Sequence, residues 1–222
     1  MHRVMLDAAG RIKSVLAIGA HADDIEIGCG GALLSLAENH GGAELVWVVF
    51  GAHGDRVEEA RRSAAEFASG FATSRIVVKG FRDGFFPYGG REVKEYFEEL
   101  KREVSPDLIF THQRSDLHQD HRLLSELTWN TFRNHLILEY EIPKYDGDLG
   151  APNVFVDLSD SIAKRKIELV LSHFASQREK HWFTEDLFHA LLRLRGMESN
   201  SASGRAEAFY CRKLVIGMSD GS

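Results

Sequence analysis

The chain has 222 residues, of which 44% are hydrophobic, and a formal net charge of −6. This length and hydrophobic content suffice for a substantial core, and we expect one domain spanning residues 1–222. The acidic balance and the scattered basic residues argue against nucleic acid as a partner. No apolar run reaches the roughly 18 residues that cross a bilayer, so we expect no membrane span.

The N-terminus and the cysteines both favour the cytoplasm. Residues 1–11 carry polar side chains where a secretory signal peptide needs an apolar centre. Cys29 and Cys211 are the only cysteines, too few for a disulfide framework. We therefore expect a soluble cytoplasmic protein with reduced thiols.

The first half of the chain alternates apolar runs with amphipathic segments. The runs are typical of buried parallel strands, and the segments between them have helical periodicity. The predicted strands cover residues 15–20, 45–50, 75–79 and 108–111. The predicted helices cover residues 30–38, 56–68 and 92–104. This alternation predicts an α/β fold, a Rossmann-like three-layer sandwich whose central sheet is mostly parallel.

The second half is less regular. Residues 123–132 should form a helix, 136–142 and 153–158 strands, and the Asp- and Gly-rich residues 143–152 a loop. Ser159 is a predicted N-cap for a helix through residue 173. A helix from residue 180 should end near Gly196, before a Ser-rich loop. Residues 206–216 should form a closing strand.

Two polar clusters follow the first and fourth predicted strands. The first contains His21, Asp23, Asp24 and Glu26, and the second lies within residues 112–121. In open parallel sheets, ligands bind beyond the carboxyl ends of the strands, so both clusters should meet at one edge. A catalytic Zn²⁺ takes three protein ligands from such side chains and leaves one position for water. The sequence therefore predicts a metal site.

The glycines of the first cluster allow a second interpretation. Residues 28–31 read Gly-Cys-Gly-Gly, which resembles the start of a dinucleotide-binding turn. The acidic residues just before them would repel a diphosphate, and the spacing is not Gly-x-Gly-x-x-Gly. We therefore expect these glycines to permit close packing of a helix.

Both clusters carry motifs of a known family. Residues 20–31 follow the pattern Ala-His-Pro-Asp-Asp-x-Glu-x-Gly-x-Gly-Gly, with Ala22 in place of proline. Residues 118–121 follow the pattern His-x-Asp-His, with Gln119 where many members have proline. On these residues the chain resembles the LmbE-like or PIG-L deacetylases, zinc-dependent enzymes that remove acetyl groups from N-acetylated amino sugars. The resemblance covers about residues 15–124.

The resemblance implies a metal centre and its cofactor. His21, Asp24 and His121 correspond to the zinc ligands of the family. Two imidazoles and a carboxylate also suit Fe²⁺, so the same residues leave both Zn²⁺ and Fe²⁺ open.

The resemblance also implies the roles of the neighbouring residues. Asp23 corresponds to the general base for the zinc-bound water, and His118 to the residue that polarises the amide carbonyl. Asp120 corresponds to the carboxylate that orients His118. Arg56 and Asp83 correspond to residues that hold sugar hydroxyls.

Four further residues are ambiguous. We expect His112 and Asp116 to support the loop rather than bind metal, because supporting groups outnumber ligands. Arg193 and Arg195 could grip a phosphate, or could be solvated cations at a helix end. The sequence leaves the choice for the two arginines open.

The predicted function is hydrolysis of an acetamide on a small-molecule amino sugar, nucleotide-linked sugars included, with a protonated His118 stabilising the oxyanion. The alternatives are a non-hydrolytic nucleotide- or sugar-binding module, or a metal hydrolase of a different amide. The sequence leaves open the sugar, the oligomeric state, a homo-oligomer included, and whether Asp23 or His118 protonates the leaving amine.

Overall fold

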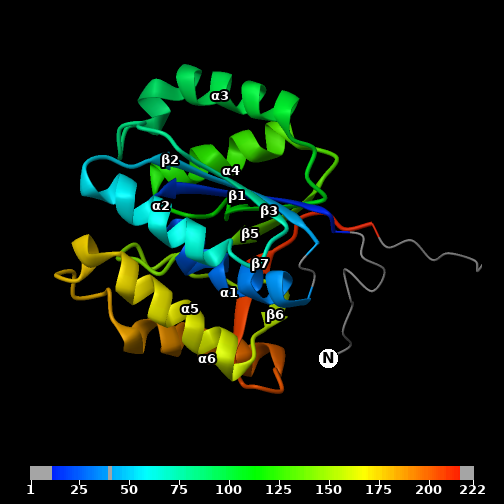
Figure 1. Cartoon of the computed structure of the whole chain (residues 1–222), viewed down its shortest axis with the longest axis vertical. Coiled ribbons are helices and arrows are strands. Elements are labelled where there is room, and N and C mark those ends of the chain that lie inside the picture. Colours follow the sequence, from blue (N-terminus) through cyan, green and yellow to red (C-terminus); the bar gives the residue numbers. More distant parts are fainter. Residues whose placement is uncertain (1–11, 40–41, 216–222) are drawn as a thin grey trace, which may run out of the picture.

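A computed structural model describes residues 12–39 and 42–215 of the chain. The polar segment 1–11 and Ile216, the end of the predicted last strand, lie outside the described residues. Within them, a seven-stranded sheet has the order β3-β2-β1-β4-β5-β7-β6 (Figure 1). Its strands are β1 (Ser14–His21), β2 (Glu44–Gly51), β3 (Thr73–Val78), β4 (Leu108–His112), β5 (Leu136–Tyr140), β6 (Val154–Asp157) and β7 (Ala206–Tyr210).

The sheet is mostly parallel, as the sequence predicts. Strands β1 to β5 pair in parallel, and only β7 runs antiparallel to its neighbours β5 and β6. Helices α3 (Gly90–Glu103) and α4 (Gln119–Thr131) cover one face (Figure 1). The other face carries α1 (Asp24–Asn39), α2 (Asp55–Phe67), α5 (Asp160–His173) and α6 (Glu185–Ser199). The predicted three-layer α/β fold is therefore confirmed.

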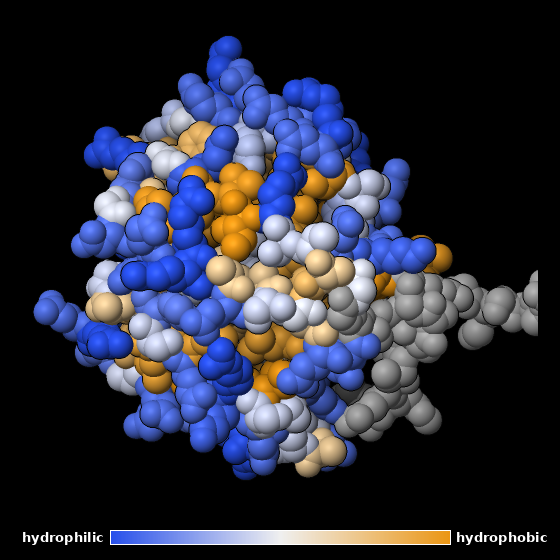
Figure 2. Space-filling model, viewed as in Figure 1, coloured by the Kyte–Doolittle hydropathy of each residue, from blue (hydrophilic) through white to orange (hydrophobic). Residues whose placement is uncertain are grey.

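The core has one half on each side of the sheet. Along β1, Leu16 and Ile18 belong to the half under α3 and α4, whereas Val15 and Ala17 belong to the half under α1. Side chains of a strand alternate between its two faces, so this strand is buried on both. Figure 2 shows hydrophobic residues between the layers and hydrophilic residues on the outer helix surfaces. In the described part of the chain, no helix is both long and apolar enough to cross a bilayer.

Two helices begin earlier than predicted. α1 starts at Asp24 rather than residue 30, and α4 starts at Gln119 rather than residue 123. Apolar periodicity misses these turns because the first turn of α4 is polar, whereas that of α1 alternates Asp24 and Glu26 with Ile25 and Ile27, which is not a helical spacing. The N-cap of α4 is His118, whose side chain accepts a hydrogen bond from the Asp120 N–H. As a result, Asp24 and Asp120 stand on first turns of helices rather than in loops, and Asp23 lies in the turn directly before α1.

The last helix begins and ends later than predicted. α6 starts after Thr184, whose hydroxyl accepts a hydrogen bond from the Leu187 N–H (3.3 Å). It ends at Ser199, and its C-cap Asn200 has a positive φ of 53°. The helix continues through Gly196. This glycine lies against Gly204, where an added Cβ would sit 2.2 Å from the backbone. Its role is close packing.

The predicted strand 206–216 is shorter in the structure. β7 ends at Tyr210, where its pairing with Glu139 of β5 also ends. Beyond it, the Cys211 N–H donates to Asn153 Oδ1 (2.8 Å) instead of continuing a ladder. The prediction for Ser159 is confirmed: its hydroxyl caps α5 by accepting from the Ile162 N–H (3.2 Å).

Candidate metal centre

The two polar clusters meet at the carboxyl edge of the sheet. β1 and β4 are adjacent, His21 is the last residue of β1, and His112 is the last residue of β4. His121 stands on the first turn of α4, which follows β4. His21 Nδ1 and His121 Nε2 are consequently 3.1 Å apart, although 100 residues separate them.

The three predicted metal ligands form a triangle of donor atoms. Its sides are 3.1 Å from His21 Nδ1 to His121 Nε2, 3.4 Å from His21 Nδ1 to Asp24 Oδ2, and 3.5 Å from His121 Nε2 to Asp24 Oδ2. In a tetrahedral zinc site with bonds of 2.0–2.2 Å, ligand atoms lie roughly 3.3–3.6 Å apart. Two imidazoles and a carboxylate at this spacing fit a divalent cation.

The charges of these groups are strongly coupled. Asp24 is only 4% exposed, and burial opposes its charge, but His121, His112 and His21 outweigh burial and hold its pKa well below the usual range. Burial likewise opposes a charge on His21, yet the carboxylates around it, Asp24 first, raise its pKa well above 6.5. The carboxylates around His21 therefore favour its protonated form, and a bound cation would compete with that proton.

A buried carboxylate orients His121. Asp116 Oδ2 accepts a hydrogen bond from His121 Nδ1 (2.9 Å), and its other oxygen accepts from the His118 N–H (2.8 Å). The first bond places the proton of His121 on Nδ1 and leaves the lone pair of Nε2 facing His21 and Asp24. Lys144 Nζ lies 2.9 Å from the same Asp116 oxygen. Asp116 thus supports His121, one of the predicted metal ligands.

Lys144 was not identified from the sequence. It lies in the loop between β5 and β6 and contacts Asp116 and Asp148, the latter at 2.5 Å. Nothing in the pattern around Lys144 predicts that this loop folds back onto the end of β4. A lysine beside a proline in a polar loop gives no signal of its own.

His112 also supports the centre. Its ring stacks on that of His121 with a centroid distance of 3.9 Å, and its Nε2 accepts a hydrogen bond from the Ala20 N–H (3.0 Å). Burial lowers the pKa of His112 to about 4, so the ring is neutral. His112 Nε2 is also 3.3 Å from Asp24, and His112, Asp24 and His121 form a second group with metal-ligand spacing. Because the lone pair of Nε2 already accepts from the backbone, its predicted role as a support is the better fit.

Asp120 has different partners from those predicted. Its carboxylate accepts hydrogen bonds from the N–H groups of Gly84 (2.6 Å) and Phe86 (3.1 Å), and it lies 3.3 Å from His21 Nε2. In the described part of the chain, no hydrogen bond joins this carboxylate to His118. The reason is tertiary: the loop after β3 comes within reach of the first turn of α4 and takes both carboxylate oxygens. Asp120 orients His21 and that loop.

His118 is positioned as a neutral donor rather than the protonated one expected. Its Nδ1 accepts the Asp120 backbone N–H (3.3 Å), which leaves the ring hydrogen on Nε2. Burial and the nearby His121 and His21 lower the pKa of His118. Its ring lies 4.9 Å from the ring of His21, centroid to centroid.

Asp23 is held by Arg56. The Arg56 Nη2 group donates to Asp23 Oδ1 at 2.7 Å, and the Asp23 side chain is buried. In the described part of the chain, Asp23 Oδ2 has no hydrogen-bond partner. Part of the guanidinium that the sequence assigns to substrate is therefore used to orient Asp23.

Asp83 lies at the mouth of the site. Its side chain is 65% exposed, and its carboxylate is 3.0 Å from His21 Nε2. The hydrogen bond from His21 lowers the pKa of Asp83 to about 2. Asp83, His21, His118 and Asp120 form a further group with metal-ligand spacing, on the outer side of His21.

Exposed aromatic side chains follow Asp83 closely in the sequence. In the loop after β3, the Phe85 and Tyr88 rings are 43% and 84% exposed, with 5.7 Å between their centroids. The Arg82 guanidinium lies 3.7 Å from the centre of the Phe85 ring. A hollow of about 240 Å³ lies among these three residues and their neighbours.

The glycines of the first motif serve packing. A Cβ on Gly28 would lie 2.1 Å from the Tyr140 ring, and one on Gly31 would lie 2.5 Å from Leu158. Only glycine lets α1 approach β5 and the end of β6 this closely. The packing interpretation of these glycines is confirmed.

Arg195 corresponds to neither predicted alternative. It is 2% exposed and forms two 2.7 Å hydrogen bonds with Glu141, through Nε and Nη2, and a third with Glu198. It is a buried structural cation, neither solvated nor free for a phosphate. Arg193, two residues away, is exposed.

Two comparisons with known proteins rest on the sequence. The family described as PIG-L, GlcNAc-PI de-N-acetylase, matches residues 16–132. The uncharacterized deacetylase YaiS of Escherichia coli strain K12 is 31% identical over 150 residues, which make up 63% of this chain and 79% of YaiS.

Two solved structures share the fold. The N,N'-diacetylchitobiose deacetylase from Pyrococcus horikoshii, 21% identical, superimposes with a TM-score of 0.73 over 94% of this chain and 86% of its own. GalB, the 4-carboxy-2-hydroxymuconate hydratase from Pseudomonas putida KT2440, is 18% identical, with a TM-score of 0.75 over 94% of this chain and 99% of its own. At these identities the two matches establish the fold and not the reaction.

Proposed function

The chain belongs to the PIG-L, or LmbE-like, family of deacetylases, and from this membership we propose that it is a metal-dependent hydrolase that removes the acetyl group of an N-acetylated amino sugar. The observation that carries the proposal is the triangle of His21 Nδ1, Asp24 Oδ2 and His121 Nε2, with sides of 3.1–3.5 Å. Its donors suit Zn²⁺, and they also suit Fe²⁺.

A divalent cation held by these three residues would lower the pKa of water and polarise the acetyl carbonyl. The Asp116 and His112 contacts support this assignment, because they orient the ring of His121 before any ion binds.

Asp23 is the proposed general base. Arg56 fixes one oxygen of its carboxylate, and the other has no protein partner among the described residues. That oxygen can take a proton from the attacking water as the water oxygen bonds to the carbonyl carbon. When the bond from carbon to nitrogen breaks, Asp23 returns this proton to the leaving amine, and acetate and the free amino sugar result.

His118 is the proposed donor to the oxyanion. Since its Nδ1 accepts the Asp120 N–H, its Nε2–H is available to the carbonyl oxygen. A neutral imidazole can donate this hydrogen bond without giving up its proton. This is why we assign the proton transfer to Asp23 alone.

The mouth of the site suits a sugar. The exposed faces of Phe85 and Tyr88 could cover the apolar face of a pyranose ring. Asp83 and the remaining N–H groups of Arg56 could hold hydroxyls beside it. We therefore keep Arg56 and Asp83 as proposed substrate-binding residues.

The test measures metal and chemistry together. Protein purified without chelator should contain about one metal ion per chain and release amine from N-acetylglucosamine derivatives. His121→Ala should lose both properties. Asp23→Ala should keep the metal and lose at least about 10²-fold in rate, as expected for a missing general base.

His189→Ala is the matched control, because it removes an imidazole from the surface of α6 and should change neither measurement. Equal metal content in wild type and His121→Ala would refute the ligand assignment. Bound metal without amine release from any acetylated sugar would favour a binding protein, and release from other amides alone would favour a different metal hydrolase.

A further inference from the structure

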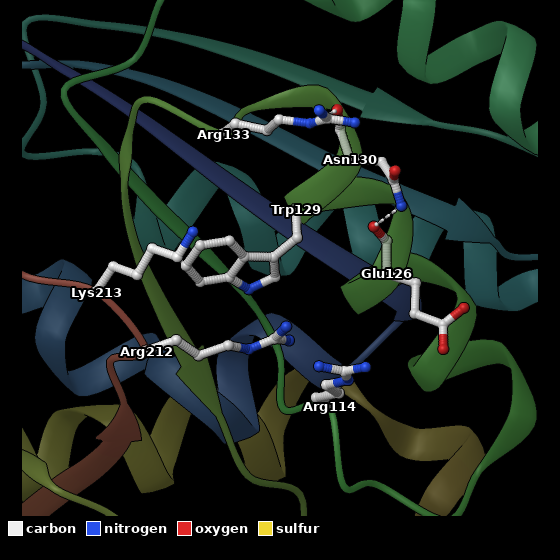
Figure 3. A pocket seen from close by; sticks show the side chains of 7 residues that line it. All are labelled: Arg114, Glu126, Trp129, Asn130, Arg133, Arg212 and Lys213. Atoms are coloured by element: carbon white, nitrogen blue, oxygen red, sulfur yellow. Dashed lines mark hydrogen bonds between the residues drawn. The ribbon is translucent and has the colours of Figure 1, made fainter.

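A second hollow lies beside the C-terminal half of α4 and has a volume of about 470 Å³ (Figure 3). None of the residues that line it belongs to the metal centre. Its walls come from α4 and the turn after it, the loop after β4 and the segment after β7. They carry Arg114, Arg133, Arg212, Lys213, Glu126 and Trp129.

The charge of this hollow is opposite to that of the chain. Four of its side chains are cationic and one, Glu126, is a carboxylate, whereas the whole chain has a formal charge of −6. Cations gathered in a concave site concentrate their field there, and this attracts anions.

One buried carboxylate joins the walls of the hollow. Glu139 of β5 is 2% exposed, and its Oε1 forms an ion pair with Arg212 Nη2 (2.5 Å) and accepts a hydrogen bond from Trp129 Nε1. Its Oε2 accepts from the Arg114 backbone N–H at 3.1 Å. The three walls are therefore fixed relative to one another.

Arg212 is held in place within the hollow by neighbouring side chains. Its guanidinium lies 4.6 Å from the centre of the Trp129 ring, and its Nη2 also donates to Ser125 Oγ at 3.1 Å. A guanidinium held by two side chains and a ring loses little freedom on binding a ligand.

The other cations have donors to spare. In the described part of the chain, the Arg114 guanidinium and the Lys213 ammonium form no hydrogen bond and no ion pair. Lys213 Nζ only approaches the Trp129 ring, at 5.9 Å from its centre. Arg133 uses its Nε, which donates to Asn130 O, and keeps its two terminal NH₂ groups free.

From this geometry we infer that the hollow binds a small organic oxyanion, a phosphate ester or a carboxylate. Guanidinium forks match the oxygens of both groups. The volume lies within the range of roughly 300–1,000 Å³ typical of small-molecule sites. The overall negative charge of the chain disfavours nucleic acid as the occupant. This inference is independent of the proposed deacetylation.

Trp129 provides the readout. The metal-loaded protein is titrated with glucose 6-phosphate, with succinate and with glucose, and Trp fluorescence and calorimetry are recorded. We expect saturable binding of at least one of the two anions and none of glucose. Succinate binding alone would identify a carboxylate as the ligand, and glucose 6-phosphate binding alone a phosphate ester.

The decisive variant is Arg114→Gln/Arg133→Gln, which leaves the pair of Arg212 and Glu139 intact. Its affinity for the bound anion should fall at least about tenfold. Arg61→Gln/Arg62→Gln on the exposed side of α2 is the matched control, because it removes the same charge elsewhere, and its affinity should stay that of the wild type.

Three outcomes would overturn the inference. They are no saturable binding of either anion, equal weakening in both double variants, and unchanged affinity in Arg114→Gln/Arg133→Gln. The last outcome is also expected if the anion binds at the metal centre and not in this hollow. Circular dichroism of each variant checks that it is folded.

Discussion

Charged side chains are buried both in isolated ion pairs and at the candidate metal centre, and the two differ in how the charge is balanced. Arg195 of α6 meets Glu141, the residue after β5, through two hydrogen bonds of 2.7 Å. Between α5 and β7, Lys166 meets Glu207 at 2.5 Å. Each of these cations has a carboxylate matched to it, so the protein itself completes the pair.

The metal centre is balanced differently. His21, Asp24 and His121 direct donor atoms at one another with separations of 3.1–3.5 Å, an arrangement that only protons or a cation can stabilise. Matched buried charges hold the fold together, whereas converging donors indicate a ligand. Four experiments can break or sharpen this comparison.

The largest effect is expected at the matched pair. Arg195→Met leaves Glu141 buried without its partner, which should lower the free energy of unfolding by about 3–5 kcal/mol in urea denaturation. Arg193→Met, on the same helix but exposed, should change it by less than about 0.5 kcal/mol. Removing the partner as well, in Arg195→Met/Glu141→Leu, should recover much of the loss. Equal stability of the two single variants would show that burial of Arg195 does not matter.

The next effect is expected in metal binding. Asp116→Asn removes the carboxylate that orients His121, so the dissociation constant for Zn²⁺ should rise about 10- to 100-fold. The exposed Asp146→Asn serves as control and should bind the ion like the wild type. A competition titration with a chromogenic chelator measures both. An unchanged dissociation constant in Asp116→Asn would show that Asp116 does not assist metal binding by His121.

Metal affinity should also depend on pH. The raised pKa of His21 means that the metal-free protein keeps a proton there at pH 7, and the ion must displace it. Since protons compete more strongly at low pH, the affinity should fall as the pH falls from 8 to 6, by up to about tenfold per unit. Zinc titrations at pH 6, 7 and 8 test this. A constant affinity would mean that His21 is already deprotonated.

The smallest effect is expected at the mouth. Tyr88→Ala removes an exposed ring that we propose to cover the sugar, so KM should rise about two- to tenfold with kcat little changed. Met197→Ala, exposed on α6, is the control and should leave both constants alone. A fall in kcat without a rise in KM would place Tyr88 in the chemistry instead of substrate binding.

Several features of the site were predictable from local sequence. The first four strands were found within about two residues because each is a continuous apolar run bounded by polar segments. The meeting of His21 with His121 followed from one rule, that parallel strands end at the same edge. The starts of α1 and α4 were missed because neither first turn has apolar residues at helical spacing: that of α4 is polar, and that of α1 alternates acidic residues with isoleucines.

By itself, the sequence determined the fold class, the family and the edge of the sheet where the polar clusters meet, because these depend on patterns within short stretches of chain. Only the tertiary structure decided which partner each charged group takes. Asp120 binds the loop after β3, Lys144 reaches Asp116, and Arg195 is buried against Glu141. The reason is that hydrogen bonds and ion pairs form over about 3 Å between segments whose distance in sequence carries no record of their distance in space.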